Sequence, residues 1–195
     1  MKAVGSWGGL VAAAVFALAV AGFGWALPGY SQVRHPVAVL GAEGVPHALG
    51  FNLLGFVLAG ALAAAVALDL RRRLPGDAGW AVRVGAQLVL LSALGFVGLG
   101  LAPLDPEDLH NRASSLHATA WMLWWVAFVP GASSIAFGLR GRAGWRSLAR
   151  ASAVAALAVL FTALFAVELM PAGVAQRLGY VAWLAWLCVA GRGGR

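Results

Sequence analysis

Residues 103–117 form the densest run of ionisable side chains in a very apolar chain, and they read Pro-Leu-Asp-Pro-Glu-Asp-Leu-His-Asn-Arg-Ala-Ser-Ser-Leu-His. The Asp-Pro-Glu-Asp pattern predicts a helix that begins here, with Asp105 as its N-cap residue. His110, Ser114 and His117 would then share one face, because steps of four and three residues return to the same side of a helix. A carboxylate, two imidazoles and a hydroxyl so arranged could perform acid–base chemistry.

In an enzymatic interpretation, Asp105 orients His117, and His117 acts as a general base toward water or the Ser31 hydroxyl. Arg177 would hold the anionic headgroup of the substrate. The reaction would be hydrolysis of a lipid-like or amphiphilic molecule at the membrane boundary. The sequence contains no His-Glu-x-x-His, Gly-x-Ser-x-Gly or phosphate-loop motif, so it leaves open whether the protein is an enzyme.

A metal-dependent version of this site would use His35, His110 and His117 with Asp105 as an oxygen ligand. Zinc accepts such a set of donors. No motif in the sequence is specific for zinc, so the cofactor is left open.

Further polar residues lie far from this stretch in sequence. Asn52 lies inside an apolar run, where a polar side chain is costly unless it has a partner, so we expect it to face the interior of the bundle. His35 belongs to a long loop, residues 28–47, that could cover the mouth of the bundle. Together with His110 and Arg177, these two residues are the predicted ligand-binding set. The sequence predicts that five polar groups converge at one end of the bundle: His35, Asn52, Asp105, His117 and Arg177.

Each of these residues also has a purely structural interpretation. A helix cap explains Asp105, an interhelical hydrogen bond explains Asn52, and a solvated ring explains His110. His117 is harder to explain in this way, because an imidazole two turns inside a span needs a partner or a water-filled space.

The elements that must position these groups are apolar helices. The chain has 195 residues, of which 62% are hydrophobic and 11% charged, and a bilayer core needs about 20 apolar residues per helix. Six runs qualify: residues 4–27, 46–68, 80–102, 113–138, 148–170 and 174–190. This pattern predicts an all-α polytopic membrane protein, a six-transmembrane-helix bundle in which residues 1–195 form a single domain.

The arginines are distributed unequally between the connections. The second connection, residues 69–83, is arginine-rich, and so is the fourth, which holds Arg140, Arg142, Arg146 and Arg150. The positive-inside rule places both in the cytoplasm. Lys2, Arg192 and Arg195 agree, so both termini are predicted to be cytoplasmic in a multi-pass protein of the inner (cytoplasmic) membrane. The candidate site then lies on the outer face.

The net charge of +7 does not indicate a nucleic-acid partner, because the basic residues lie in short loops where they would meet anionic lipid. Membrane lipids are therefore the expected partners, and an oligomer is compatible with the sequence. The single cysteine, Cys188, excludes an intrachain disulfide.

Several short motifs resemble the domain of unknown function 998 family, a group of six-span bacterial and archaeal membrane proteins. The motifs are Tyr30-Ser31, His35-Pro36 and Leu40-Gly41, then Phe51-Asn52, Gly55-Phe56 and Gly60, then Pro103-Leu-Asp105, His117 and Gly173-x-x-Gln176-Arg177. They extend over most of the chain. The resemblance implies the fold and the topology but no activity.

The leading functional hypothesis is an integral membrane protein whose outward-facing polar cavity binds, and in one version hydrolyses, a lipid-like or amphiphilic ligand. The alternative is a non-catalytic small transporter, or a structural or partner subunit of a membrane complex, in which the same polar groups conduct or hold the helices together.

Overall fold

The computed structural model describes residues 2–194, and the side chains of residues 7–194. The side chains of Lys2 and Arg195, which entered the topology prediction, lie outside that part. The elements along the chain are α1 (Lys2–Ala26), a 3-10 turn η1 (Val37–Gly41), α2 (Ala48–Phe51), a π-helix η2 (Asn52–Leu58), α3 (Ala59–Arg73), α4 (Trp80–Leu101), α5 (Arg112–Leu139), α6 (Arg146–Leu164), α7 (Ala166–Leu169) and α8 (Ala172–Ala190).

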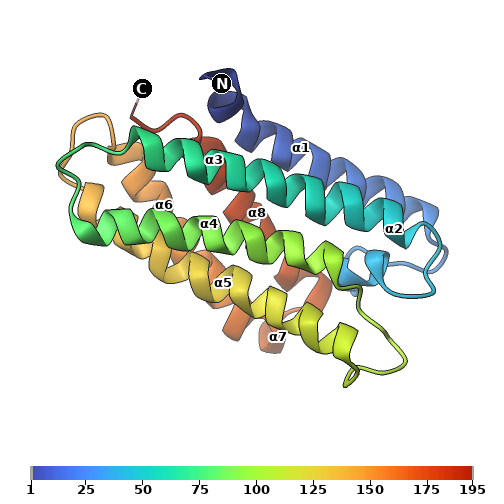
Figure 1. Cartoon of the computed structure of the whole chain (residues 1–195). Helices are drawn as coiled ribbons and strands as arrows, with labels where there is room; N and C mark the ends of the chain where they lie inside the picture. Colours follow the sequence, from blue (N-terminus) through green and yellow to red (C-terminus); the bar gives the residue numbers. More distant parts are fainter. Residues whose placement is uncertain (1, 195) are drawn as a thin grey trace.

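Six helical segments of the described chain are long and apolar enough to cross a membrane. They are α1 from Trp7, the continuous α2–η2–α3 segment, α4, α5, α6 and α8. The six segments run alongside one another as a bundle, with α8 behind α3 and α4 (Figure 1). The prediction of an all-α, six-span membrane protein is confirmed.

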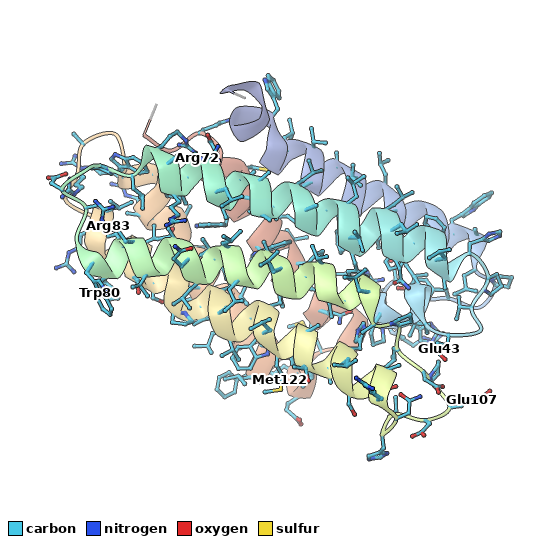
Figure 2. The ribbon with its side chains drawn as sticks, viewed as in Figure 1. Glu43, Arg72, Trp80, Arg83, Glu107 and Met122 are labelled. Carbon is cyan, nitrogen blue, oxygen red and sulfur yellow. The ribbon has the colours of Figure 1, made fainter. Side chains whose placement is uncertain are left out.

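The two ends of the bundle differ in chemistry (Figure 2). One end, which we call the arginine end, holds the α3–α4 and α5–α6 connections and both chain termini (Figure 1). The opposite end, the histidine end, holds the α1–α2 and α4–α5 connections with three of the four histidines, and Figure 2 shows Glu43 and Glu107 there.

Two predicted helix boundaries are wrong. The second span does not end near residue 68 but continues to Arg73, and the Asp69 carboxylate accepts a hydrogen bond from Arg73 Nε at 2.8 Å, one turn along the helix. The fifth span ends at Leu164, where the chain changes direction into the short helix α7. The apolar pattern marked neither boundary. Charged residues form the last turn of α3, and apolar residues continue past the end of α6 at Leu164.

Helices α1 and α8 approach each other until their backbones almost touch. A Cβ atom added to Gly9 would overlap the carbonyl of Leu187 and lie 2.7 Å from the Cys188 nitrogen. In a membrane the hydrophobic effect does not drive helices together, so their association depends on close packing. Small residues permit that close packing. The glycine at position 9 therefore sets the distance between the first and last spans.

The first long loop does not cover the bundle mouth from outside but enters the bundle. Val37, Ala38 and Leu40 of η1 are buried, and Glu43 N–H donates to the Leu104 carbonyl at 2.8 Å. The loop thus joins α1 and α2 to the α4–α5 connection, and it brings residues 30–36 against the start of α8.

Candidate functional site

Arg177, on the second turn of α8, is the centre of the most extensive polar cluster at the histidine end. Its Nε and Nη2 donate to the same oxygen of Gln32, at 3.0 and 2.6 Å, and Nη2 also donates to the Tyr30 hydroxyl at 2.6 Å. Its Nη1 donates to the carbonyls of His35 and Gly173, at 2.9 and 2.8 Å. All five guanidinium N–H groups therefore have acceptors, and every acceptor is neutral. We call Tyr30, Gln32, His35, Gly173 and Arg177 the arginine clamp.

Gly173 allows the loop backbone to reach this position. A Cβ on Gly173 would lie 2.6 Å from the carbonyl oxygens of Val33 and His35 and 2.9 Å from that of Gln32. One turn along α8, the Gln176 side-chain oxygen accepts the Val37 N–H at 2.6 Å. The first loop is thus held against α8 through its backbone, because only a residue without a side chain fits beneath those carbonyls.

The clamp also affects the chemistry of Tyr30. Its hydroxyl donates to the Pro36 carbonyl at 3.2 Å while it accepts from Arg177. Burial raises the pKa of Tyr30 above its usual range, and the neighbouring Arg177 charge partly opposes this rise. The hydroxyl therefore stays protonated at neutral pH and acts as an uncharged link between loop and cation.

Ser31 and His35 are hydrogen-bonded to each other within one turn of the first loop. His35 Nδ1 accepts the Ser31 backbone N–H at 3.0 Å, so its proton is on the other ring nitrogen when the ring is neutral. The Ser31 hydroxyl accepts the Arg34 N–H at 3.3 Å. No hydrogen bond joins Ser31 to His117 among the described residues. The proposed nucleophile and base are therefore not paired in this structure.

Asn52 faces the bundle interior, as its depth predicted. The side chain is 3% exposed and its Nδ2 donates to the Gly41 carbonyl at 2.9 Å. Its partner belongs to η1, and Gly41 has no room for a side chain because a Cβ there would overlap Asn52 Oδ1. Asn52 is the first residue of the π-helix η2, a wider turn of the kind often found at functional positions.

Asp105 is not the N-cap of α5, which is the fourth span, so this prediction is wrong. Helix α5 begins at Arg112, and Asn111 caps it by accepting the Ser114 N–H at 2.8 Å. The Asp105 carboxylate instead closes a turn: one oxygen accepts the N–H groups of Glu107 and Asp108, and the other accepts Asn111 Nδ2–H at 2.6 Å. Asp105 therefore supports the cap residue.

His110, Ser114 and His117 do not share a helical face, because His110 precedes the helix. His110 is exposed, whereas Ser114 and His117 are buried on α5. The Ser114 hydroxyl donates to the Asp108 carbonyl at 2.9 Å and accepts the Asp105 N–H at 3.1 Å. It fastens the connecting loop to the helix.

His117 is buried between α4 and α5 and has a backbone partner. The ring is 8% exposed, and Nδ1 lies 2.8 Å from the carbonyl oxygen of Ala102, at the end of α4. Since a carbonyl only accepts, the proton is on Nδ1. The Phe56 ring packs edge-on against the imidazole, with 6.4 Å between ring centroids. The structure thus pairs His117 with the end of α4, and it does not place Asp105 as the hydrogen-bond partner of this ring.

The predicted zinc set is also not assembled. Within the part of the chain that the structure describes, no three His, Cys, Asp or Glu side chains lie close enough together to hold a metal ion. His35, His110 and His117 each belong to a different local arrangement, as described above. The five polar residues predicted to converge at the histidine end therefore belong to separate clusters. Among the described residues, the arginine clamp joins two of the five, His35 and Arg177.

An apolar groove runs along the membrane-facing surface from the arginine clamp. It has a volume of about 580 Å³ and lies between α1 and α8, with Gln32 and Arg177 at the histidine end and Cys188 toward the other. From Arg177 to Cys188 it follows roughly 16 Å of α8 at 1.5 Å per residue. Its remaining lining side chains are small or apolar: Ala13, Phe16, Ala17, Val20, Ala21, Val181, Leu184 and Ala185.

The model of a family described as a protein of unknown function, DUF998, matches residues 11–193. The chain belongs to this family. No curated protein and no solved structure matches the chain.

Three of the motifs through which this chain resembles the DUF998 family meet in space. Tyr30, His35, Gly173 and Arg177 belong to three separate motifs of that resemblance, and all four are part of the arginine clamp. The clamp is therefore the candidate functional site of this DUF998 protein.

Sequence reasoning missed two residues of this region. Gln32 provides the oxygen that accepts two Arg177 hydrogen bonds, and nothing in its sequence surroundings distinguishes it from other loop residues. Asn111 caps α5, and here a signal existed, because an Asn before a helical run is as good an N-cap as an Asp.

Proposed function

We propose that this DUF998 protein binds an anionic amphiphile without covalent chemistry, with the apolar chain in the α1–α8 groove and the headgroup at Arg177. The observation that carries the proposal is the continuity of an apolar groove with a half-buried guanidinium that has no acidic partner among the described residues. A groove length of roughly 16 Å suits one leaflet of a bilayer core about 30 Å thick.

The Arg177–Gln32 pair supports an anionic headgroup. The Gln32 oxygen occupies the position between Nε and Nη2 in which a carboxylate or phosphate oxygen binds an arginine. Gln32 is a neutral residue on a loop, so an anion could replace it and gain a charge-assisted interaction. Hydrolysis has no comparable support, because Ser31, Asp105 and His117 have separate hydrogen-bond partners.

Retention of a single-chain anionic lipid by the purified protein would test the proposal. Native mass spectrometry would compare oleoyl lysophosphatidylglycerol with the zwitterionic oleoyl lysophosphatidylcholine. Ala185→Trp would fill the groove from an exposed wall position, and Gln32→Glu would place a permanent carboxylate beside Arg177. Each variant should weaken binding of the anionic lipid roughly tenfold, a loss of about 1.4 kcal/mol.

Ala14→Trp is the matched control, because Ala14 is exposed on α1 but does not line the groove. It should bind as the unmodified protein does. Equal binding by the Ala185→Trp and Ala14→Trp variants, or no preference for the anionic lipid, would contradict the proposal.

We also propose that the histidine end faces the exterior and the arginine end the cytoplasm, in the inner membrane. The support is the excess of arginine at the α3–α4 and α5–α6 connections. A cysteine introduced at the exposed Gly76, in a chain whose Cys188 is replaced by serine, should resist an impermeant thiol reagent in intact cells and react after permeabilisation. Labelling in intact cells would reverse the orientation.

A further inference from the structure

A second groove lies between α5 and α6 and opens at the arginine end, on helices that do not line the α1–α8 groove. Its volume is about 610 Å³. On α5 it extends from Val129 to Arg140, and on α6 from Arg146 to Leu160, so each wall covers roughly 16 to 21 Å of helix at 1.5 Å per residue. Away from one end, the walls consist of alanines, aliphatic residues, Phe137 and Ser133.

Three arginines line the end of this groove: Arg140, Arg146 and Arg150. All three are exposed, and within the described residues none has an ion pair or a hydrogen bond from its side chain. Arg140 makes a cation–π contact: its guanidinium carbon lies 5.7 Å from the centre of the Phe137 ring. No acidic side chain lines the groove.

Three other arginines at the same end have partners within the fold. Arg73 donates to the Ala190 and Gly193 carbonyls at the end of α8, Arg83 to Gly76 and Ala78, and Arg142 to Asp77 at 2.7 Å. These three arginines therefore have a role in holding the fold together. Within the described part of the chain, no such hydrogen bonds account for the three arginines that line the groove.

The spacing of Arg146 and Arg150 strengthens this contrast. They are four residues apart on α6, where like charges repel each other. An anion bound between Arg146 and Arg150 would relieve that repulsion. Its negative charge would also attract the guanidinium of Arg140. A phosphate accepts hydrogen bonds from several guanidinium groups at once.

We propose that the α5–α6 groove binds an anionic phospholipid, with its phosphate at Arg140, Arg146 and Arg150 and an acyl chain along Ala153, Leu157 and Leu160. Basic pockets next to apolar helix surfaces recognise such headgroups. The apolar walls favour a lipid over free phosphate, because free phosphate would use only the charged end. This site lies at the opposite end of the bundle from Arg177 and is independent of the function proposed there.

Native mass spectrometry of the protein released from nanodiscs of equimolar dioleoyl phosphatidylglycerol and dioleoyl phosphatidylcholine would test this site. In the double variant Arg146→Gln with Arg150→Gln, retention of phosphatidylglycerol should fall by roughly tenfold or more. Retention of phosphatidylcholine should not change. The charge-matched control, Arg72→Gln with Arg192→Gln, removes two exposed arginines of the same end that do not line the groove. It should retain phosphatidylglycerol as the unmodified protein does.

A second pair of variants tests the apolar walls. Ala153→Trp would fill the groove, whereas Val154→Trp adds the same ring at an exposed neighbouring position outside it. Only the first should lose phosphatidylglycerol. The Ala153→Trp variant should still bind the single-chain lipid of the α1–α8 groove, so failure at one groove is distinguishable from failure at the other.

Three results would overturn the inference. Equal losses in the two double variants would show a general effect of charge, and unchanged binding in Arg146→Gln with Arg150→Gln would remove the assigned headgroup site. Displacement of phosphatidylglycerol by millimolar inorganic phosphate would show that the site takes phosphate instead of lipid.

Discussion

Arg177 and Gln32 lie 145 positions apart in the sequence, yet the single side-chain oxygen of Gln32 accepts hydrogen bonds from both Nε and Nη2 of Arg177. Gln32 in turn donates from its amide nitrogen to the Val20 carbonyl of α1 at 3.0 Å. The pair therefore links the first span, the first loop and the last span through one amide group.

Replacement of Arg177 by lysine should destabilise the protein. A lysine has three donors on a compact head, whereas the arginine clamp presents four acceptor groups around a planar guanidinium. We expect a loss of about 1–3 kcal/mol in unfolding free energy, because loop carbonyls lose their donors. Unfolding in detergent, followed by circular dichroism, would measure it. Arg34→Lys, at an exposed loop position, should change nothing measurable, and an equal effect there would contradict this prediction.

Gly9 and Gly22 should respond oppositely to alanine. At Gly9 the new methyl group would overlap the Leu187 backbone, which cannot rotate away, so Gly9→Ala should cost about 1–3 kcal/mol. Gly22 lies on the same helix with nothing within 4 Å of the added atom, and there alanine should be neutral or stabilise by about 0.5–1 kcal/mol. Thermal unfolding of the two variants, measured side by side, checks the pair. A tolerated Gly9→Ala would mean that α1 and α8 are farther apart.

His117 has a structural partner that gives a first test of its role. His117→Leu removes the donor to the Ala102 carbonyl and should lower stability by about 1–3 kcal/mol. His117→Gln retains an N–H donor and should lose less. The catalytic role of His117 stays a prediction: if Gln preserves the fold but abolishes a measurable activity, the ring does more than cap α4. If Leu and Gln are equally stable, the bond to Ala102 contributes little.

The clamp should make stability depend on alkaline pH through Tyr30. Because burial raises the folded-state pKa of Tyr30 above its ordinary value of about 10, the unfolded chain releases this proton first as pH rises. The contribution of the protonated Tyr30 hydroxyl to the free energy of unfolding is therefore fully present below about pH 10. It declines as pH rises through the folded-state pKa. Tyr30→Phe should flatten that decline, although its stability at neutral pH will be lower because two hydrogen bonds are missing.

Unfolding curves of the two proteins at several pH values would show the difference as a change in slope. Tyr180 is present in both and serves as the internal reference. Parallel slopes above pH 10 would contradict the assignment to Tyr30.

The amino-acid sequence by itself determined the membrane class, the six spans and the family. A run of about 20 apolar residues has few alternatives in lipid, because a helix satisfies every backbone group within the segment. For the same reason the interior orientation of Asn52 followed from its position alone: a lone amide in a hydrophobic span must find a partner.

Boundaries and contacts required the tertiary structure. Asp105 and Asn111 are both good caps, and the sequence did not show that Asp105 would close a turn and hold Asn111 while Asn111 caps α5. The sequence did place Arg177 near a membrane end, but its partners come from a loop whose path depends on the buried side chains of η1. Which neutral oxygens surround a cation is decided by the packing of distant segments, since hydrogen bonds to a loop carbonyl leave no periodic pattern in the chain.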